Sequence, residues 1–405
     1  MDTQLSTAKK TIVGVQFLFV AFGSTVLVPL LIGLDPATAL FTAGVGTFIF
    51  HMVTKGAVPI FLGSSFAFIA PIIASSQKWG MPGTLAGISG VALVYFIMSA
   101  LIKWRGLRLL SRLFPPVVIG PVIITIGLVL SPSAVNMAKE NWLLALIALL
   151  AAICVTILGK GLFKLVPIIC GIIAGYIAAL CMGMVDLTSV SEAPWFALPP
   201  SIVHFHLPKY SWDPFIYMIP VAIAPVIEHI GDVYVVEAVA EKRFVKDPGL
   251  HRTMLGDGLA CLFASFAGGP PVTTYSEVTG AMQITRITSP QVIRIAAGTA
   301  IVFSVIGKLS ALLQTIPSPV LGGIMLLLFG SIASIGVHNL IQNHVDLNQT
   351  RNLIIVSVTL TLGIGGAIIQ FGNFSMSGIG LSAVTGIVLN LLLPRHTPSE
   401  LDAKE

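Results

Sequence analysis

Runs of about 20 apolar residues, separated by short polar turns, follow one another along almost the whole chain. A run of this length is what an α-helix needs to cross the hydrocarbon core of a bilayer. Several runs are shorter or are interrupted by glycine. The pattern predicts an all-α polytopic membrane protein with fourteen spans, at 11–34, 36–53, 57–75, 83–102, 114–131, 141–159, 165–184, 213–237, 250–267, 271–285, 290–316, 319–337, 351–370 and 375–394.

The tenth run is unusual because it opens on two glycines and two prolines, GGPP, and continues with the β-prone residues VTTY. Proline cannot continue a helical hydrogen-bond ladder, so the sequence predicts a short extended segment and then a helix starting near Ser276. A helix that starts inside the membrane exposes free N–H groups. Such backbone is tolerated only where it lines a protein cavity, as in the discontinuous helices of transporters.

An internal repeat relates the two halves of the chain. PVVIG resembles PVLGG, LGKG resembles LGIG, and Gly63 aligns with Gly268, at offsets of 203 to 205 residues (116 to 319, 158 to 362, 63 to 268). Seven spans per repeat is an odd number, so the two repeats must be inverted in the membrane. The repeat pairs span 3 with span 10 and predicts that GSSFAF, at 63–68, is a second extended segment that leads into a half-helix.

Composition excludes a soluble domain. The chain of 405 residues is 55% hydrophobic and only 10% charged, with a mean hydropathy of +0.95, whereas soluble domains carry about 25% charged residues. The four cysteines all lie within apolar runs, so the spacing indicates neither a disulfide framework nor a zinc site. No metal, no cofactor and no enzyme active site is expected.

Positive charge reports topology here, not nucleic-acid binding. With the N-terminus inside, 17 of the 22 Lys and Arg fall in inside segments, and outside loops hold only Lys78, Lys139 and Lys209. By the positive-inside rule both termini are predicted to be cytoplasmic. The first apolar run lacks a small-residue cleavage site, so it is interpreted as a span and not as a removable signal peptide.

Acidic residues inside the membrane are costly and mark functional sites. Glu228 and Asp232 are four residues apart and share one face of span 8, so one of them should hold a proton at neutral pH. His229 points about 100° away and is interpreted as a packing histidine. Glu277 opens the half-helix of span 10; the alternative is a capping box with Thr274. Asp257 and Lys308 are embedded without a predicted partner.

Four motifs together resemble the nucleobase-ascorbate transporter family (nucleobase-cation symporter 2), most of all its bacterial uracil permeases. They are LGSSFAFIAP, the EHIGD run at 228–232, DPGLHR at 247–252, and Glu277 with Gly280, Thr285 and Arg286 at family spacing. QFLFVAFGSTVLVP and IPSPVLGGIMLLLFG extend the similarity over essentially the whole chain. The chain departs from the family pattern at Val278, Phe17 and Ser276, where members carry Asn, His and Gly, and Asp232 stands where uracil permeases have His.

The resemblance implies a seven-plus-seven inverted repeat in the cytoplasmic (inner) membrane and, in several members, a homodimer. A core domain would comprise 1–112 and 213–316, and a gate domain 113–212 and 317–405. Glu228 and Glu277 would hydrogen-bond the base, Phe66 would stack on it, the backbone at Tyr275 and Ser276 would face it, and Ser24 would line the pocket. Phe66 as an ordinary packing residue is the alternative.

The implied activity is proton-coupled nucleobase uptake, with Glu228 or Asp232 as the coupling group. Uracil presents two N–H donors and two carbonyl acceptors, so two glutamates in different protonation states suit it. A xanthine or purine permease is the alternative. An anion carrier of the same fold is disfavoured because clustered carboxylates repel an anion. The expected partners are the nucleobase, the bilayer and a second copy of the chain, with no nucleic acid.

Overall fold

The computed structural model describes residues 6–106, 112–160, 163–203, 211–371 and 374–394. Helices dominate, as expected where backbone groups in lipid must satisfy one another. The first half contains α1 (Thr7–Ile32), α2 (Pro36–Val53), α3 (Ile69–Arg105), α5 (Pro116–Ala138), α6 (Trp142–Leu158), α7 (Pro167–Cys181), α8 (Thr188–Glu192) and α9 (Pro200–Val203), with short turns η2 (Phe66–Phe68) and η3 (Phe163–Leu165). The second half contains α10 (Trp212–Ala240), the π-type turn η4 (Val245–Gly249), α11 (Leu250–Phe266), α12 (Ser276–Thr285), α13 (Pro290–Ser304), α14 (Gly307–Gln314), α15 (Ser318–Gln342), α16 (Thr350–Ile364) and α17 (Gly378–Leu392).

Two buried three-residue strands, β1 (Leu62–Ser64) and β2 (Val272–Thr274), join the halves of the chain. They pair antiparallel, with Leu62 opposite Thr274 and Ser64 opposite Val272. Each strand leads into a helix: β1 into η2 and α3, and β2 into α12. The strands lie where the sequence predicts extended segments in spans 3 and 10, and Gly63 faces Thr273.

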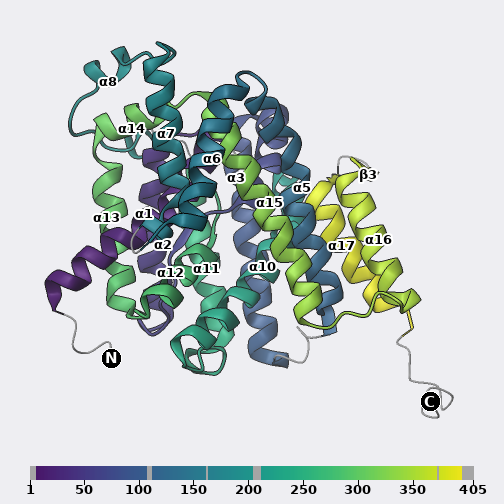
Figure 1. Cartoon of the computed structure of the whole chain (residues 1–405). Helices are drawn as coiled ribbons and strands as arrows, with labels where there is room; N and C mark the ends of the chain where they lie inside the picture. The colour runs from purple at the N-terminus through teal and green to yellow at the C-terminus, as the bar shows by residue number, and fades with distance from the viewer. Residues whose placement is uncertain (1–5, 107–111, 161–162, 204–210, 372–373, 395–405) are drawn as a thin grey trace.

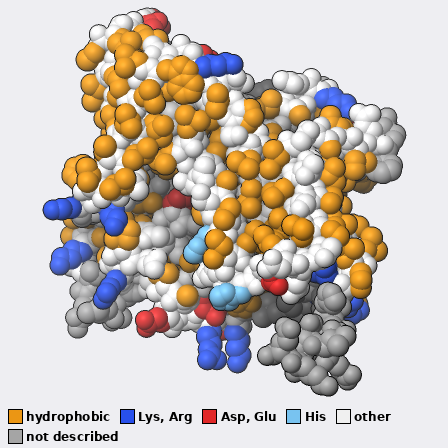
Figure 2. Space-filling model, turned by 45° about the vertical axis from the view of Figure 1, so that its right-hand side comes forward, with side chains coloured by type: hydrophobic (Ala, Val, Ile, Leu, Met, Phe, Trp, Pro, Cys, Tyr) orange, Lys and Arg blue, Asp and Glu red, His pale blue; other side chains and the backbone are white. Residues whose placement is uncertain are grey.

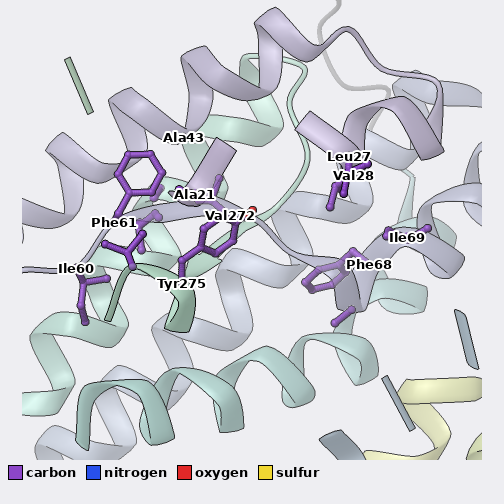
Figure 3. Packing of buried hydrophobic residues seen from close by; sticks show 14 of the residues in the cluster. Ala21, Leu27, Val28, Ala43, Ile60, Phe61, Phe68, Ile69, Val272 and Tyr275 are labelled. Carbon is purple, nitrogen blue, oxygen red and sulfur yellow. The ribbon is translucent and has the colours of Figure 1, made fainter. Parts of the chain in front are cut away.

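A tyrosine fits into the space left by a glycine at this crossing. A Cβ atom at Gly63 would lie 2.3 Å from the Tyr275 ring, so only glycine allows this approach. The Tyr275 hydroxyl donates to the Ser64 carbonyl at 2.8 Å, and the Ser65 N–H donates to the Pro271 carbonyl at 2.9 Å. Figure 3 shows Tyr275 packed in the apolar interior near Phe61 and Val272.

The helices pack in two sets. Around the strand pair, α11 packs on α2 and α3, α13 on α1 and α2, and α10 on α3. In the second set, α15 packs on α5 and α6, α7 on α6, and α16 and α17 on each other and on α5. The sets meet where α10 contacts α5 and α17 and where α1 contacts α7. Figure 1 shows α1, α2, α12 and α13 on one side of the molecule and α16 and α17 on the other.

Small residues let α5 and α15 approach closely. A Cβ at Gly127 would lie 2.3 Å from the Phe329 carbonyl oxygen, and one at Gly336 would lie 2.7 Å from the Gly120 carbonyl oxygen. Close backbone approach at small residues is the usual way that membrane helices gain packing contacts.

Among the described residues, six helices are long and apolar enough to cross a membrane, namely α1, α2, η2 with α3, α5, α10 and α15. Within the same ranges, five further apolar helices of 10–17 residues are shorter: α6, α7, α13, α16 and α17. Hydrophobic side chains cover most of the face in Figure 2, and Lys and Arg side chains gather mainly toward its lower edge.

The structure corrects several predicted span boundaries. The predicted break between spans 3 and 4 is present, because the backbone of α3 is non-helical at Gly80 (φ 70°, ψ 171°), although the helical segments on either side reach beyond the predicted limits. Span 11 is divided into α13 and α14. Spans 13 and 14 each include a strand, because β3 (Ile368–Phe371) and β4 (Phe374–Ser377) form an antiparallel hairpin. A run of apolar residues does not distinguish a complete helix from a short helix with a strand at its end.

The segment 185–212, between α7 and α10, contains α8 and α9, and it exposes Trp195 and Phe196. Its residues 204–210 lie outside the described part of the chain. So do Arg108, Lys209, Arg395 and Lys404, which contribute to the topology prediction.

Candidate functional site

A cavity of ≈ 2220 Å³ lies between α10, the β2–α12 segment and the helices α5 and α15. Its inner end is lined by Glu228, Asp232 and Glu277, and it extends to Lys242 and Asn343. Figure 2 shows this face hollowed near its middle, with an acidic side chain visible in the hollow. The structure therefore brings Glu277 to Glu228 and Asp232, from which it is 49 and 45 residues distant in the sequence (228 to 277 and 232 to 277).

Asp232 is held by two hydroxyl groups. Thr274 Oγ1 donates to one carboxylate oxygen and Ser276 Oγ to the other, each at 2.6 Å. Hydroxyl bonds to a carboxylate at this distance are short and charge-assisted. They fasten α10 to the β2–α12 segment, because Thr274 ends β2 and Ser276 starts α12.

Glu228 and Glu277 leave acceptor capacity toward the cavity. Both side chains are half-buried. Glu277 lies in the first turn of α12, where the helix dipole favours a carboxylate, and it accepts one hydrogen bond from Ser24 Oγ at 3.2 Å. Glu228 makes no side-chain hydrogen bond with any residue in the described ranges. These two carboxylates are thus available to a polar ligand.

Phe66 lines the same cavity from η2 and is half-buried. Its ring meets that of Phe329 on α15 edge-to-face, with centroids 6.1 Å apart and an angle of 87°. Edge-to-face contact is one of the favoured arrangements of two aromatic rings. The Phe66 side chain is thus part of the cavity wall and is not a fully buried core residue.

The other expected site residues take different positions. Ser276 is exposed to the cavity, with its hydroxyl on Asp232. Tyr275 directs its side chain away to Ser64 and is only 5% exposed, so its backbone is the part that can face a ligand. Ser24 is fully buried and reaches the cavity through its hydrogen bond to Glu277.

Residues 8–371 match the model of a permease family. The chain belongs to this family, the nucleobase-ascorbate transporters. It is 49% identical to the probable uracil permease of Haemophilus influenzae, with 96% of this chain and 95% of that protein aligned. It is 44% identical to the uracil permease of Bacillus subtilis, with 96% and 94% aligned. It is therefore a multi-pass membrane protein of a transporter family.

A solved structure of low sequence identity has the same fold. The transmembrane domain of a cyanobacterium bicarbonate transporter, BicA, superposes with a TM-score of 0.65 at 14% identity, covering 94% of this chain and 96% of that one. At this identity the match shows a shared fold only.

Sequence reasoning missed how His229 of α10 pairs with Asp257 and Thr253 of α11 in a buried cluster of this transporter. His229 Nδ1 lies 2.8 Å from Asp257 Oδ2, and His229 Nε2 lies 2.9 Å from Thr253 Oγ1. His229 is fully buried with a partner at both ring nitrogens, and Asp257 has the partner that the sequence did not reveal. The sequence offered one indication of this pairing, which is that His229 lies on a different face of its helix from Glu228 and so points toward a neighbouring helix.

Two further expectations are settled by contacts. The Thr274 hydroxyl donates to Asp232 and α12 begins after Tyr275, so the capping box of Thr274 with Glu277 is wrong. Lys308 has partners after all, because its ammonium donates to the Val190 and Ser191 carbonyls. Within the described ranges no group of three or more His, Cys, Asp or Glu side chains could hold a metal ion.

Proposed function

We propose that this protein imports uracil across the cytoplasmic membrane by proton symport. The observation that carries the proposal is the cavity in which Glu228 and Glu277 offer free acceptor sites beside the Phe66 ring. The names of the permease relatives, which describe uracil as their substrate, point to the same ligand.

The chemistry of the cavity suits a flat base with alternating donors and acceptors. A carboxylate accepts the N–H bonds of uracil, and a protonated carboxyl also donates to its carbonyls. Base stacking on Phe66 would add about 1–3 kcal/mol. Backbone N–H groups at the start of α12, near Ser276, supply further donors.

Proton coupling follows from carboxylates that share one low-dielectric cavity. Close like charges are disfavoured there, so a proton on one carboxylate stabilises the site. Asp232 has both oxygens occupied by hydroxyl donors, whereas neither oxygen of Glu228 accepts a hydrogen bond from a residue that the structure describes. We therefore place the transported proton on Glu228 first, with Asp232 as the second choice. If uracil binds the protonated form better, base and proton travel together by linkage.

Alternating access would come from movement of a core domain (1–112 and 213–316) against a gate domain (113–212 and 317–405). We retain fourteen spans in a seven-plus-seven inverted repeat for this arrangement. The cavity extends to the end that carries Lys242 and Arg286. With both termini cytoplasmic, as the positive-inside rule predicts, this conformation is open to the cytoplasm. The assembly would be a homodimer that needs no cofactor besides the proton.

An anion carrier is the alternative that the shared fold raises, since BicA transports bicarbonate. Three carboxylates at the inner end of the cavity oppose an anionic substrate by repulsion. A xanthine or purine permease shares the family and differs in the size of the base.

Uptake of labelled uracil into proteoliposomes, with competition by unlabelled bases and bicarbonate, tests the proposal. Uracil should compete fully, xanthine and other purines weakly, and bicarbonate not at all. Stronger competition by xanthine would reassign the substrate to purines. Uracil uptake no greater than in empty vesicles would reject a uracil transporter.

A further inference from the structure

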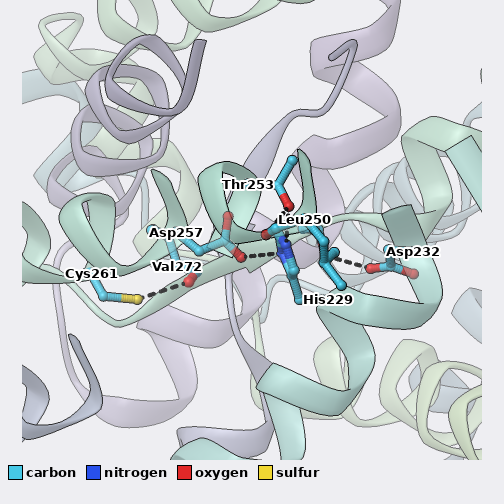
Figure 4. A network of polar contacts seen from close by, with 8 residues as sticks. His229, Asp232, Leu250, Thr253, Asp257, Cys261 and Val272 are labelled. Atoms are coloured by element: carbon cyan, nitrogen blue, oxygen red, sulfur yellow. Dashed lines mark hydrogen bonds and ion pairs between the residues drawn. The ribbon is translucent and has the colours of Figure 1, made fainter. Parts of the chain in front are cut away.

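In the buried cluster of His229, Asp257 and Thr253, the hydrogen bonds show which atom carries one of the protons. The Thr253 hydroxyl has a single hydrogen and donates it to the Leu250 carbonyl at 2.9 Å. Toward His229 Nε2, at 2.9 Å, the same hydroxyl must accept, so Nε2 carries a hydrogen. Figure 4 shows His229 directed at Asp257 and Thr253, with Asp232 on the other side.

The remaining ring nitrogen then faces a carboxylate oxygen across 2.8 Å. Either His229 Nδ1 is protonated and Asp257 is ionised, or Asp257 is protonated and donates to a neutral ring. Each arrangement contains one proton between Nδ1 and Oδ2, and each has a net charge of zero. Both side chains are 0% exposed, so the pair holds one proton out of contact with solvent.

Three buried polar atoms connect the His229–Asp257 pair to the cavity. Asp257 Oδ1, the Tyr95 hydroxyl and Thr273 Oγ1 have no hydrogen-bond partner within the described ranges. Tyr95 is close enough to interact electrostatically with Asp257 and through its hydroxyl with Thr273, and Thr273 is in the cavity wall. A buried polar atom without a partner costs about 1–3 kcal/mol. One water molecule would accept from both hydroxyls and donate to Asp257 Oδ1, which are the three bonds typical of a buried water.

The groups around Asp257 limit where its proton can go. On α11 itself, Cys261 donates to the Val272 carbonyl and is not part of the path. From α2, the Phe50 ring packs on the neighbouring Gly256. The titratable groups of other elements that interact with Asp257 are His229, which is bonded to it, and Tyr95 of α3 and Glu228 of α10, which act on it electrostatically.

We propose that the His229–Asp257 pair is a second proton site of the transport cycle, exchanging its proton with Glu228 through a water held by Tyr95 and Thr273. When the proton leaves, His229 stays neutral with its Nε2 hydrogen and Asp257 becomes ionised, so the pair changes from zero to minus one. Glu228 gains the proton and changes from minus one to zero. The total charge of the core is unchanged, which avoids the cost of creating a new charge in the membrane.

This inference rests on the proposed proton symport of uracil, and two assays in proteoliposomes separate them. Counterflow exchanges labelled for unlabelled uracil and needs no net proton movement, whereas accumulation is driven by an acid-outside pH gradient. Asp257→Asn should retain counterflow and lose accumulation by about 5- to 150-fold, the range of a typical coupling free energy. Tyr95→Phe, which keeps the ring contact with His229, should show the same split with a smaller loss.

The matched controls are Asp35→Asn, which alters an aspartate bonded to Ser310 and Gln314, and Tyr176→Phe, which removes a hydroxyl bonded to Thr315. Both should keep counterflow and accumulation. Accumulation at the parent level in Asp257→Asn would overturn the pair's role alone. Parallel loss of counterflow and accumulation in both test variants would make the cluster structural and also overturn it. A parent protein that shows counterflow but ignores the gradient would instead overturn the proton symport.

Discussion

The two segments that cross at the strand pair have the same architecture and different chemistry. The first arm, 61–68, and the second arm, 272–285, each consist of a three-residue strand followed by a helical turn or helix. The first arm contributes hydroxyls, a glycine and the Phe66 ring, and it is uncharged. The second arm contributes Thr274, Ser276 and Glu277, which are tied to the carboxylate network. We infer that the first arm shapes the cavity for a flat ligand and the second recognises its polar edge.

The largest expected effect is at the second arm. Glu277→Gln should abolish uracil transport while the protein stays folded, because an amide does not present two acceptor oxygens to the base. Uptake into proteoliposomes and thermal unfolding of the purified protein measure the two properties. Glu192→Gln, on the exposed helix α8, is the matched control and should be unchanged in both. Uptake near the parent level in Glu277→Gln would remove the second arm from recognition.

A change in the first arm should act mainly through folding. Gly63→Ala places a methyl group 2.3 Å from the Tyr275 ring, so the strands must separate or the ring must move. Overpacking of this kind costs about 1–3 kcal/mol of stability. Thermal unfolding in detergent measures it. Gly330→Ala, where a Cβ meets nothing within 4 Å, should be neutral or slightly stabilising. Equal melting temperatures for the two variants would contradict the close packing of Tyr275 on Gly63.

Phe66→Ala tests whether the first arm contacts the base. Loss of an aromatic stacking surface should weaken uracil binding by about 1–3 kcal/mol. Phe66→Tyr and Phe66→Trp should retain more affinity because they keep a ring. Isothermal titration calorimetry gives the dissociation constants. An alanine variant that binds uracil as the parent does would leave Phe66 as a packing partner of Phe329.

The smallest effect is expected at Ser24, which touches the second arm from α1. Ser24→Ala removes the hydroxyl at 3.2 Å from Glu277 and should weaken binding by about 0.5–1.5 kcal/mol, the net value of one hydrogen bond. Ser131→Ala, a hydroxyl bonded only to its own helix, is the control. A loss as large as that of Glu277→Gln would mean that Ser24 has a more direct role than orienting the carboxylate.

Sequence predicted the two arms because their signals are local. Prolines, glycines and β-prone residues break an apolar run wherever it occurs, and the spacing of Glu228 and Asp232 places them on one helix face. The His229–Asp257 pair could not be predicted, because it depends on how α10 packs near α11. The fit of Tyr275 over Gly63 is likewise a contact between segments more than 200 residues apart (63 to 275).

The central claim is that carboxylates of this cavity couple uracil to a proton, and gradient-driven uptake tests it most directly. Labelled uracil accumulation is measured in proteoliposomes with and without an imposed acid-outside gradient, for the parent, Glu228→Gln and Asp232→Asn. Glu228→Gln imitates the protonated carboxyl, so it should retain some binding and lose the dependence on the gradient, while Asp232→Asn should only shift the pH optimum. Gradient-driven accumulation that survives in Glu228→Gln and vanishes in Asp232→Asn would move the coupling role to Asp232. Survival in both variants would contradict coupling through this pair.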